Sequence, residues 1–446
     1  MSQIKENPAL VAAQEAQRKI NEALDAGYSF RLEAGAGAGK TYSLVAALKK
    51  LIDERGSMLV RTGKKVACIT YTEVARNEIA QEIEDHPAIL VDTIHGFCWA
   101  FIRQFQKAIR DLVSEIDDKK EKIELGGGIG SQLVEYDLGF FSVDEKRITL
   151  NHDDIPELMA MLLAKEKFQM LFSEQFPVIF IDEYQDTNRK FMDAITEFFL
   201  KPKTGPIIGL FGDHWQTIYS SEYELAEYPI EEIAKGSNFR SAPAIVNVLN
   251  TLRPELPQAV SVPEAKGEAR FFHTNAYKGG RTDELHSKED LPSDLARSCR
   301  EELIIRLQGE GWDLQKTKVL MLSHNVLAIE QGYPQIAELF KRHTEQFTKK
   351  EDPVIRFFAE VIEPICIAYS SSLYGEMFKK LGTRPAITKH EDKMLWRRDM
   401  DQLLKLRNEG TIGQVIDHLK TTKRPLPSDR ILRREEEILS LMDTPE

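Results

Sequence analysis

The segment AGAGAGKT, residues 34–41, constrains the fold of this 446-residue chain more than any other. It follows a short β-type run at 28–32 and opens a helical stretch that continues to about residue 54. Glycines let a backbone turn its N–H groups toward phosphate oxygens, and the N-terminus of a helix adds a favourable dipole. Lys40 can neutralise the β- and γ-phosphates, and Thr41 can hold Mg²⁺ through its hydroxyl. Although Ala34 stands where the usual motif has its first glycine, the sequence predicts a nucleotide site.

Apolar runs recur at 66–70, 178–181 and 207–211 and alternate with helical segments. This pattern is typical of a parallel sheet whose two faces are both covered by helices. Asp182 and Glu183 directly follow the run at 178–181, at the sheet edge where open α/β sheets bind ligands. Asp182 can help to hold Mg²⁺, and Glu183 can orient or deprotonate an attacking water. Taken alone, an Asp-Glu pair after a strand is also often a solvated turn.

We expect four regions along the chain. Residues 1–104 and 166–235 form the nucleotide-binding lobe, and the charged segment 105–165 forms a small inserted domain. Residues 236–344 begin a second α/β lobe, with strands expected at 268–273 and 318–323. Residues 345–446 are predicted to be mostly helical and supply no clear closing strand, so the second lobe is predicted to be incomplete.

The charge balance restricts how the chain can bind nucleic acid. A net charge of −12 argues against binding by bulk phosphate neutralisation, although a local basic or aromatic groove is compatible with it. The N-terminal residues lack a signal-peptide pattern, and no apolar run approaches the roughly 18 residues that a membrane span needs. We therefore expect a cytoplasmic protein without a membrane segment.

Six motifs in a fixed order give the chain a resemblance to the UvrD/Rep-like superfamily 1 helicases. The loop with alanine first, DEYQDT at 182–187, GDHWQTIY at 212–219 and NFRS at 238–241 resemble four of them. The runs 70–79 and 93–97 resemble the family's early DNA-contacting motifs, and Gln17 stands where the family places an adenine-reading glutamine. The resemblance implies an α/β fold: a RecA-like P-loop NTPase lobe, a small inserted domain, and a second, incomplete RecA-like lobe with a helical insertion.

The resemblance also implies roles for single residues. Gln216 would sense the γ-phosphate, Phe239 would stack on adenine unless it is a core aromatic, and Arg240 would stabilise γ-phosphate charge unless it is an unrelated surface arginine. The implied catalytic residues are Lys40, Asp182, Glu183, Gln216 and Arg240, with Thr41 and Asp182 on Mg²⁺. The implied ATP-binding residues are Gln17, Ala34, Gly35, Ala36, Gly37, Ala38, Gly39, Lys40, Thr41, Tyr42, Phe239 and Arg240.

A track for single-stranded DNA is implied as well, made of aromatic side chains and helix N-termini. Stacking of a base on an aromatic ring contributes about 1–3 kcal/mol and tolerates any sequence. Trp215, one of the candidates, can equally pack between the lobes. The implied DNA-contacting residues are Tyr71, Thr72, Thr93, His95, Trp215 and Tyr219.

Several positions depart from the family pattern. Tyr42 replaces a residue that is usually basic, and Glu73 and Val74 replace an Asn-Lys pair of the DNA motif. Residues 242–446 contain neither the fifth motif nor the sixth, which carries a second catalytic arginine. Three explanations stay open: a chain that stops early, a site completed by a partner, or a nucleotide switch that hydrolyses poorly. In size the chain resembles the compact helicase-like subunits of anti-phage systems such as Gabija, which pair with a nuclease.

Two functions are therefore expected from the sequence. The first is an ATP-dependent helicase or translocase that moves on single-stranded DNA in the 3'-to-5' sense and couples ATP hydrolysis to lobe closure. The alternative is a regulatory subunit that senses nucleotide or DNA and gates a partner nuclease, of OLD-family type, with little unwinding. An unrelated phosphate-loop enzyme such as a nucleotide kinase does not explain the other five motifs.

Overall fold

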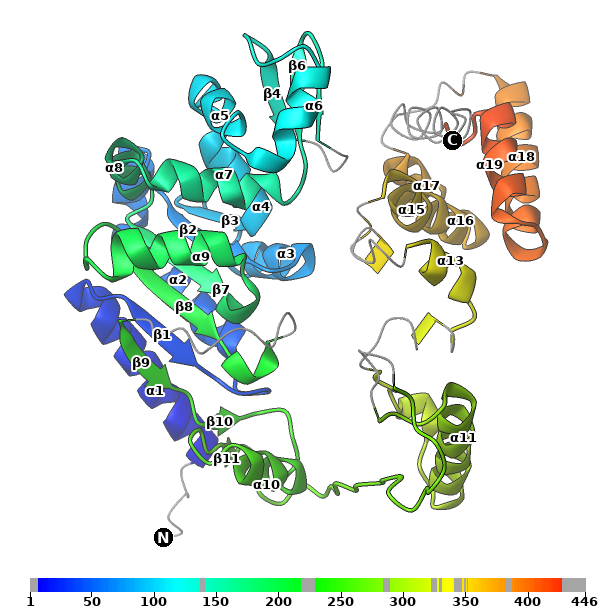
Figure 1. Cartoon of the computed structure of the whole chain (residues 1–446). Coiled ribbons are helices and arrows are strands. Elements are labelled where there is room, and N and C mark those ends of the chain that lie inside the picture. The colour runs from blue at the N-terminus through cyan, green and yellow to red at the C-terminus, as the bar shows by residue number, and fades with distance from the viewer. Residues whose placement is uncertain are drawn as a thin grey trace. The chain divides into compact units, whose positions relative to one another are not determined.

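The computed structural model describes residues 7–136, 141–217, 229–283, 289–321, 327–328, 331–340, 347–348, 350, 352–381, 387 and 389–426. The chain divides into two compact units, Met1–Arg270 and Phe271–Glu446. Figure 1 follows the chain through both of them. The motifs singled out from the sequence all lie in the first unit.

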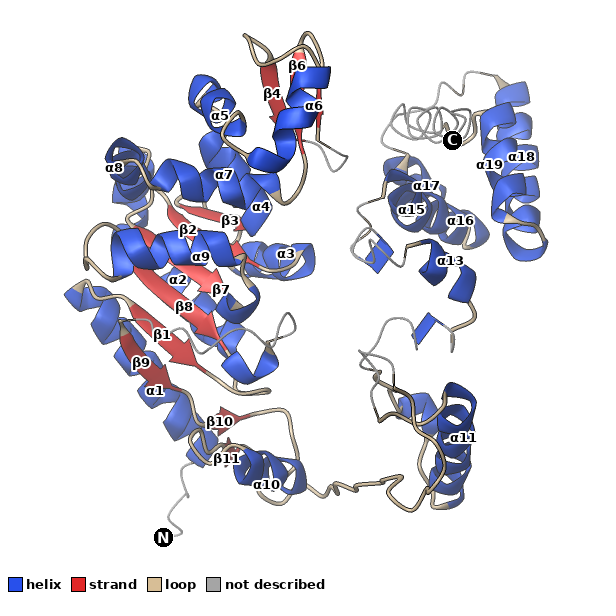
Figure 2. Ribbon diagram, in the orientation of Figure 1, coloured by secondary structure: helices blue, strands red, loops and turns tan. Residues whose placement is uncertain are grey.

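Six parallel strands form the central sheet of the first unit, in the order β3-β2-β7-β8-β1-β9 (Figure 2). Every residue of β2 and β7 is buried, as their continuous apolar runs predict. β1, which leads into the phosphate loop, is an internal strand between β8 and β9. The strand bounds are β1 (Phe30–Glu33), β2 (Val66–Thr70), β3 (Ile89–Thr93), β7 (Val178–Asp182), β8 (Ile207–Gly212) and β9 (Glu231–Ala234).

Helices cover both faces of this sheet, because side chains alternate along each strand. In β7, Val178 and Phe180 join one apolar core, while Ile179 and Ile181 join the other. Helices α1 (Pro8–Ala26), α2 (Lys40–Thr62) and α3 (Glu73–Glu82) contribute to the first core. The second core takes side chains from α4 (Ile94–Ile102), α7 (Asp154–Leu163), α8 (Glu166–Gln175), α9 (Arg189–Ile195) and the π-helical turn η3 (Thr196–Leu200). The predicted α/β class with a parallel sheet is confirmed.

The segment between α4 and α7 forms a small sheet of its own, β4-β6-β5. Its apolar residues Ile109, Val134 and Ile148 belong to the same core as α4 and α7, which anchors the segment to the large sheet. The elements are α5 (Gln106–Val113), η1 (Asp117–Lys119), α6 (Lys120–Leu125), β4 (Leu133–Tyr136), β5 (Ser142–Val143) and β6 (Arg147–Leu150).

After β9 the chain returns to the phosphate loop. β10 (Ser237–Asn238) pairs in parallel with β11 (Ala259–Val260), and α10 (Pro243–Leu252) connects the two. The Asn7 side chain donates a hydrogen bond to the Ser261 carbonyl at 2.8 Å. This pair of short strands therefore lies beside the start of α1.

The described part of the second unit is helical. Residues from α15 to α19 share a small apolar core that includes Ile365, Met400 and Leu403. None of the helices in the described ranges combines the length and apolar character needed to cross a lipid bilayer. The elements are α11 (Ser293–Gly309), η5 (Leu314–Lys316), α13 (Pro334–Leu339), α15 (Pro353–Phe357), η6 (Phe358–Ile362), α16 (Glu363–Ser370), α17 (Tyr374–Lys380), α18 (His390–Glu409) and α19 (Ile412–Thr422).

Two predicted strands are wrong where the structure describes them. Residues 268–273 and 318–321 form no strand, and 322–323 lie outside the described residues. Phe271 is 89% exposed and Leu320 is 90% exposed, so these short apolar runs find neither a partner strand nor a core. Runs of this length cannot be assigned from periodicity alone. Residues 236–270 also cluster with the first unit, whereas the sequence placed the start of a second lobe at 236. The four-region division stays a prediction.

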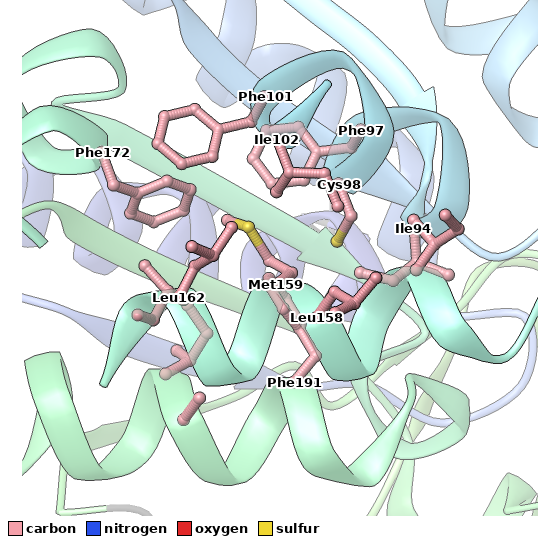
Figure 3. Packing of buried hydrophobic residues seen from close by; sticks show 14 of the residues in the cluster. Ile94, Phe97, Cys98, Phe101, Ile102, Leu158, Met159, Leu162, Phe172 and Phe191 are labelled. Carbon is pink, nitrogen blue, oxygen red and sulfur yellow. The ribbon is translucent and has the colours of Figure 1, made fainter. Parts of the chain in front are cut away.

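The aromatic core under α8 yields a stability prediction. Phe172 is fully buried, and its ring centroid lies 5.3 Å from that of Phe101 and 6.0 Å from that of Phe97 (Figure 3). We expect Phe172→Ala to lower the free energy of unfolding by about 3–5 kcal/mol, because it removes the ring and leaves a cavity. Urea unfolding followed by circular dichroism measures this. Met170→Ala, on the exposed side of α8, should change stability by less than about 0.5 kcal/mol; equal effects would contradict the packing described.

Candidate nucleotide-binding site

The phosphate loop joins the carboxyl end of β1 to the first turn of α2. Gly37 and Gly39 have φ angles of 79° and 80°, in the left-handed region where other side chains are strained. A Cβ at Gly37 would also lie 3.0 Å from both Asn238 Oδ1 and Arg240 Cβ. The loop conformation therefore depends on glycine here, because residues 238–240 pack directly against it.

Four consecutive carbonyl groups of the loop accept hydrogen bonds from one segment, residues 235–239, which we call the bracing segment. Its residues Lys235, Ser237 and Asn238 are almost completely buried. Gln258 supports it, because Asn238 Nδ2 also donates to Gln258 Oε1 at 2.9 Å. The four bonds run from Asn238 Nδ2 to Ala36 (3.0 Å), Phe239 N to Gly37 (2.9 Å), Ser237 Oγ to Ala38 (3.1 Å) and Lys235 Nζ to Gly39 (2.7 Å).

Four backbone N–H groups of the loop and the first turn of α2 are available to a ligand. Within the described ranges, nothing accepts a hydrogen bond from the N–H groups of Gly37, Gly39, Lys40 and Thr41. With the carbonyls bound on the other side, these donors and the N-terminus of α2 form a site for an anion. The geometry is that expected of a phosphate-binding loop.

The two predicted carboxylates stand at the carboxyl end of β7. Lys40 Nζ lies 2.6 Å from Glu183 Oε2. Glu183 has a φ of 48°, a left-handed conformation in which few residues other than glycine are found. Burial, with a smaller contribution from the Glu183 charge, raises the pKa of Asp182 to about 6, although Lys40 partly opposes this. Asp182 Oδ1 is buried and has no hydrogen-bond partner among the residues that the structure describes, an arrangement that suits a carboxylate that binds a cation.

A pocket of about 600 Å³ lies beside the loop, between α1, α2 and the bracing segment. Four residues predicted from the sequence line it: Gln17, Gly39, Tyr42 and Phe239. Both rings are accessible, since Tyr42 is 76% and Phe239 43% exposed. Gln17 Nε2 donates to Asn21 Oδ1 at 3.2 Å, while Gln17 Oε1 is buried and has no partner in the described part of the chain. Two accessible rings and an open acceptor suit a planar base that carries a hydrogen-bond donor.

Gln216 lies in a short helical turn after β8, η4 (His214–Gln216), and its side chain donates to Asp213 Oδ2 at 2.6 Å. Asp213 also accepts a bond from Arg253, which follows α10. The other guanidinium nitrogen of Arg253 donates to Glu33 Oε1 at 3.0 Å. The predicted γ-phosphate sensor is thus tied through Asp213 and Arg253 to the strand that precedes the phosphate loop.

Glu33 is the most completely bonded carboxylate of this network. It accepts bonds from the Tyr184 hydroxyl at 2.8 Å and from the His214 backbone N–H at 2.9 Å. Burial alone would raise the pKa of Glu33, but the bonds from His214 and Tyr184 outweigh it and hold the pKa below its ordinary value. Glu33, Asp213 and His214 lie close enough to bind a metal ion. Because Arg253 already bonds to both carboxylates, this cluster is an ion-pair network.

The remaining predicted ligand residues lie on the surface of the loop region. Arg240 is exposed, and its backbone N–H donates to Asn238 Oδ1 at 3.0 Å. Within the described ranges, its guanidinium has no hydrogen-bond partner. Thr41 is partly buried in the first turn of α2. The structure thus brings the loop, Thr41 and Arg240 to the carboxyl edge of the sheet.

The structure describes five of the six predicted DNA-contacting residues. Thr72 and Thr93 are the N-caps of α3 and α4, where their hydroxyls accept bonds from Ala75 and Gly96 at 3.1 and 3.3 Å. His95 stacks on His152 of the inserted segment, with ring centroids 3.3 Å apart. Tyr71 is partly buried, and Trp215 is 56% exposed with the Arg253 guanidinium 5.7 Å from its ring. Tyr219 lies outside the described residues.

Sequence reasoning missed four residues of the site: Glu33, Lys235, Arg253 and Gln258. Glu33 carried a weak signal, since it is a charged residue that ends the β-type run before the loop. Lys235 carried one only through its position three residues before the NFRS motif. Arg253 and Gln258 carried none, because their partners Glu33 and Ala36 lie more than 200 positions away in the chain.

Comparisons with known proteins agree with this geometry. Residues 16–222 match a family model described as an AAA domain. The chain is 24% identical over 426 residues to Gabija protein GajB of Bacillus cereus (strain HuB5-5), a match that covers 73% of this chain and 60% of that protein. It is 24% identical over 206 residues to the RecBCD enzyme subunit RecB of Chlamydia muridarum (44% and 19% covered), and 29% identical over 128 residues to RecB of Chlamydia pneumoniae (26% and 12% covered).

The fold, the loop and the family match together define a P-loop nucleotide-binding protein. The segment that matches the AAA domain model, residues 16–222, contains the phosphate loop, the Asp182–Glu183 pair and Gln216. The chain is similar to GajB over 73% of its own length and spans about 60% of the length of that relative.

The buried network around Arg253 yields a second prediction. We expect Arg253→Met to lower the free energy of unfolding by about 3–5 kcal/mol at pH 7.5, because Glu33 and Asp213 lose their shared counter-charge. The lowered pKa of Glu33 means that its ionised form stabilises the fold above its unfolded pKa and that this stability is lost as the pH falls. The difference between wild type and Arg253→Met should therefore shrink as the pH falls from 7.5 toward 4.

Urea unfolding across this pH range measures the effect, with Arg18→Met on the exposed side of α1 as the control. A deficit that is independent of pH, or equal for the two variants, would contradict the assignment of Arg253 as the counter-charge.

Proposed function

We propose that this chain is an ATP-dependent motor that acts on single-stranded DNA. The observation that carries the proposal is the constellation at one sheet edge: free loop amides, Lys40, the Asp182–Glu183 pair, and Gln216. Phosphoryl transfer needs positioning and charge compensation more than covalent chemistry, and these groups supply both. Acting on DNA, the protein is expected in the cytoplasm.

ATP is the nucleotide that fits the pocket and loop together. Its triphosphate would accept bonds from the loop amides and from Lys40, while the adenine would enter the pocket between Tyr42 and Phe239. The 6-amino group of adenine would donate to the open Oε1 of Gln17. Within the described ranges, the loop amides and Gln17 Oε1 have no other partner, and the nucleotide would displace Lys40 from Glu183.

Mg²⁺ fits the same edge of the sheet. The buried, unpartnered Asp182 Oδ1 and the Thr41 hydroxyl are oxygen donors of the kind this ion prefers. When bound, the ion would compensate charge on the β- and γ-phosphates. It would also remove the cost of an isolated charge at Asp182.

In this account each residue has one task in turnover. Nucleotide would draw Lys40 away from Glu183, which frees the Glu183 carboxylate to orient the attacking water. Gln216, held by Asp213, would contact the γ-phosphate. Because Trp215 is its neighbour in the chain, this contact would couple the nucleotide to the proposed DNA-binding surface. Arg240, above Gly37, would compensate charge as the γ-phosphate leaves. Nucleotide-dependent lobe closure would then advance the chain along DNA, in the 3'-to-5' sense of the family it resembles.

The DNA surface would lie along the carboxyl ends of β2 and β3. The N-termini of α3 and α4 begin there, and helix N-termini bind phosphate groups. Trp215, more than half exposed, offers a ring on which a base can stack. This arrangement would let an acidic protein bind single strands without a broad basic face.

A second function is favoured by the relatives. RecB is named as a subunit of the RecBCD enzyme, and GajB as a Gabija protein. The alternative is that this chain is a regulatory subunit that senses nucleotide or DNA and gates a partner nuclease, of OLD-family type, with little unwinding.

The role of Glu183 gives the direct test. We expect Glu183→Gln to bind ATP but to hydrolyse it about 10²–10⁴ times more slowly, because the amide cannot accept the proton of the attacking water. Lys40→Ala should lose nucleotide binding. Phosphate release and equilibrium ATP binding measure the two effects, with Glu197→Gln, an exposed carboxylate, as the control. Full turnover by Glu183→Gln would overturn the assigned role.

Strand displacement separates the motor from the regulatory subunit. A motor should separate a duplex with a 3' single-stranded tail in an ATP-dependent reaction that Lys40→Ala abolishes. A regulatory subunit should bind ATP and DNA without displacing the strand.

A further inference from the structure

Lys235 is the most deeply buried cation of the site, and its bond to the loop does not require a charge. It follows β9, and only 1% of its surface is exposed. Its ammonium group donates to the Gly39 carbonyl and to Ser43 Oγ, both at 2.7 Å. An ammonium group has three protons, so one donor remains.

The charge of Lys235 has no counter-charge in the part of the chain that the structure describes. Burial alone lowers the pKa of Lys235 to about 8, and no charged side chain contributes to that shift. Holding a cation in such a place costs stability unless a partner compensates it. The two acceptors in place are a neutral carbonyl and a hydroxyl, which leaves the charge unbalanced.

Lys235 lines the same pocket as Gln17, Tyr42 and Phe239. It lies beside the two rings, because a Cβ at Gly39 would be 3.5 Å from Lys235 Nζ, 3.8 Å from Tyr42 Cβ and 3.9 Å from Phe239 Cδ2. The pocket therefore holds two unused polar groups of opposite kind, the acceptor Gln17 Oε1 and the third donor of Lys235. A ligand that satisfies both must present a donor and an acceptor.

We propose that Lys235 is a nucleotide-recognition residue, which donates to an acceptor atom on the purine nucleoside while Gln17 accepts from its amino group. An adenine carries both features, an exocyclic amino group and ring nitrogens with lone pairs. The inference rests on the proposed function, since it names a further contact of the same nucleotide. It assigns to Lys235 the recognition of the nucleoside, whereas Lys40 acts on the phosphates.

The experiment compares a nucleotide with its phosphate part alone. Isothermal titration calorimetry at pH 7 with Mg²⁺ measures binding of a non-hydrolysable ATP analogue and of inorganic tripolyphosphate to the full chain. We expect Lys235→Met to weaken binding of the ATP analogue about tenfold or more, the range for a hydrogen bond from a charged group. Binding of tripolyphosphate should weaken much less, because the other three bonds from the bracing segment still hold the loop. Lys49→Met, on the exposed face of α2, is the matched control and should change neither.

The outcomes separate the inference from the function on which it rests. Unchanged affinity for the ATP analogue in Lys235→Met overturns the inference, as does an equal loss for both ligands, which would mean that Lys235 only shapes the loop. A wild-type chain that binds neither ligand overturns the proposed function as well. Lys235→Gln keeps a donor but loses the charge, and it replaces Lys235→Met if thermal unfolding shows that Lys235→Met does not fold. The same two comparisons apply to it: the inference expects a larger loss of affinity for the ATP analogue than for tripolyphosphate.

Discussion

The hydrogen bonds between the bracing segment and the phosphate loop are the constraint on which the rest of the site depends. A loop rich in glycine has many conformations, and only one of them presents its amides together. Four carbonyl bonds from residues 235–239 hold that conformation before any ligand arrives. The loop is thus preorganised, so an anion binds without the entropy cost of ordering the loop.

This arrangement makes the nucleotide site a product of distant sequence. The loop itself is encoded at 34–41, but its support comes from residues about 200 positions later. The same later stretch supplies Phe239 and Lys235 to the base pocket and Arg253 to the buried network. The base pocket, the phosphate loop and the γ-phosphate sensor are therefore all connected to this later stretch of the chain. Coupling between nucleotide and DNA has a physical route here, from Glu33 and Asp213 through Arg253 to the exposed Trp215 ring.

The sequence predicted most of the first unit because its signals are local. Apolar runs gave the buried strands β2, β7 and β8, and the Gly-Lys-Thr loop gave the start of α2. The carboxylates Asp182 and Glu183 were predicted because strand ends meet at one edge. Long-range partners were not predictable: Arg253 reads as an ordinary surface arginine until Glu33 and Asp213 lie beside it. The strands predicted at 268–273 and 318–323 fail for the opposite reason, since a short apolar run is not a strand without a neighbour.

The measurement that tests this account most directly is ATP hydrolysis by the full chain with and without single-stranded DNA, with Lys40→Ala as the blank. The account predicts hydrolysis that depends on Lys40 and that single-stranded DNA stimulates, which would show that one chain completes the site. Tight ATP binding with negligible turnover in either condition would contradict the motor, and the regulatory subunit would then be the better description. Hydrolysis equal to that of Lys40→Ala, with no ATP bound, would contradict the nucleotide site itself.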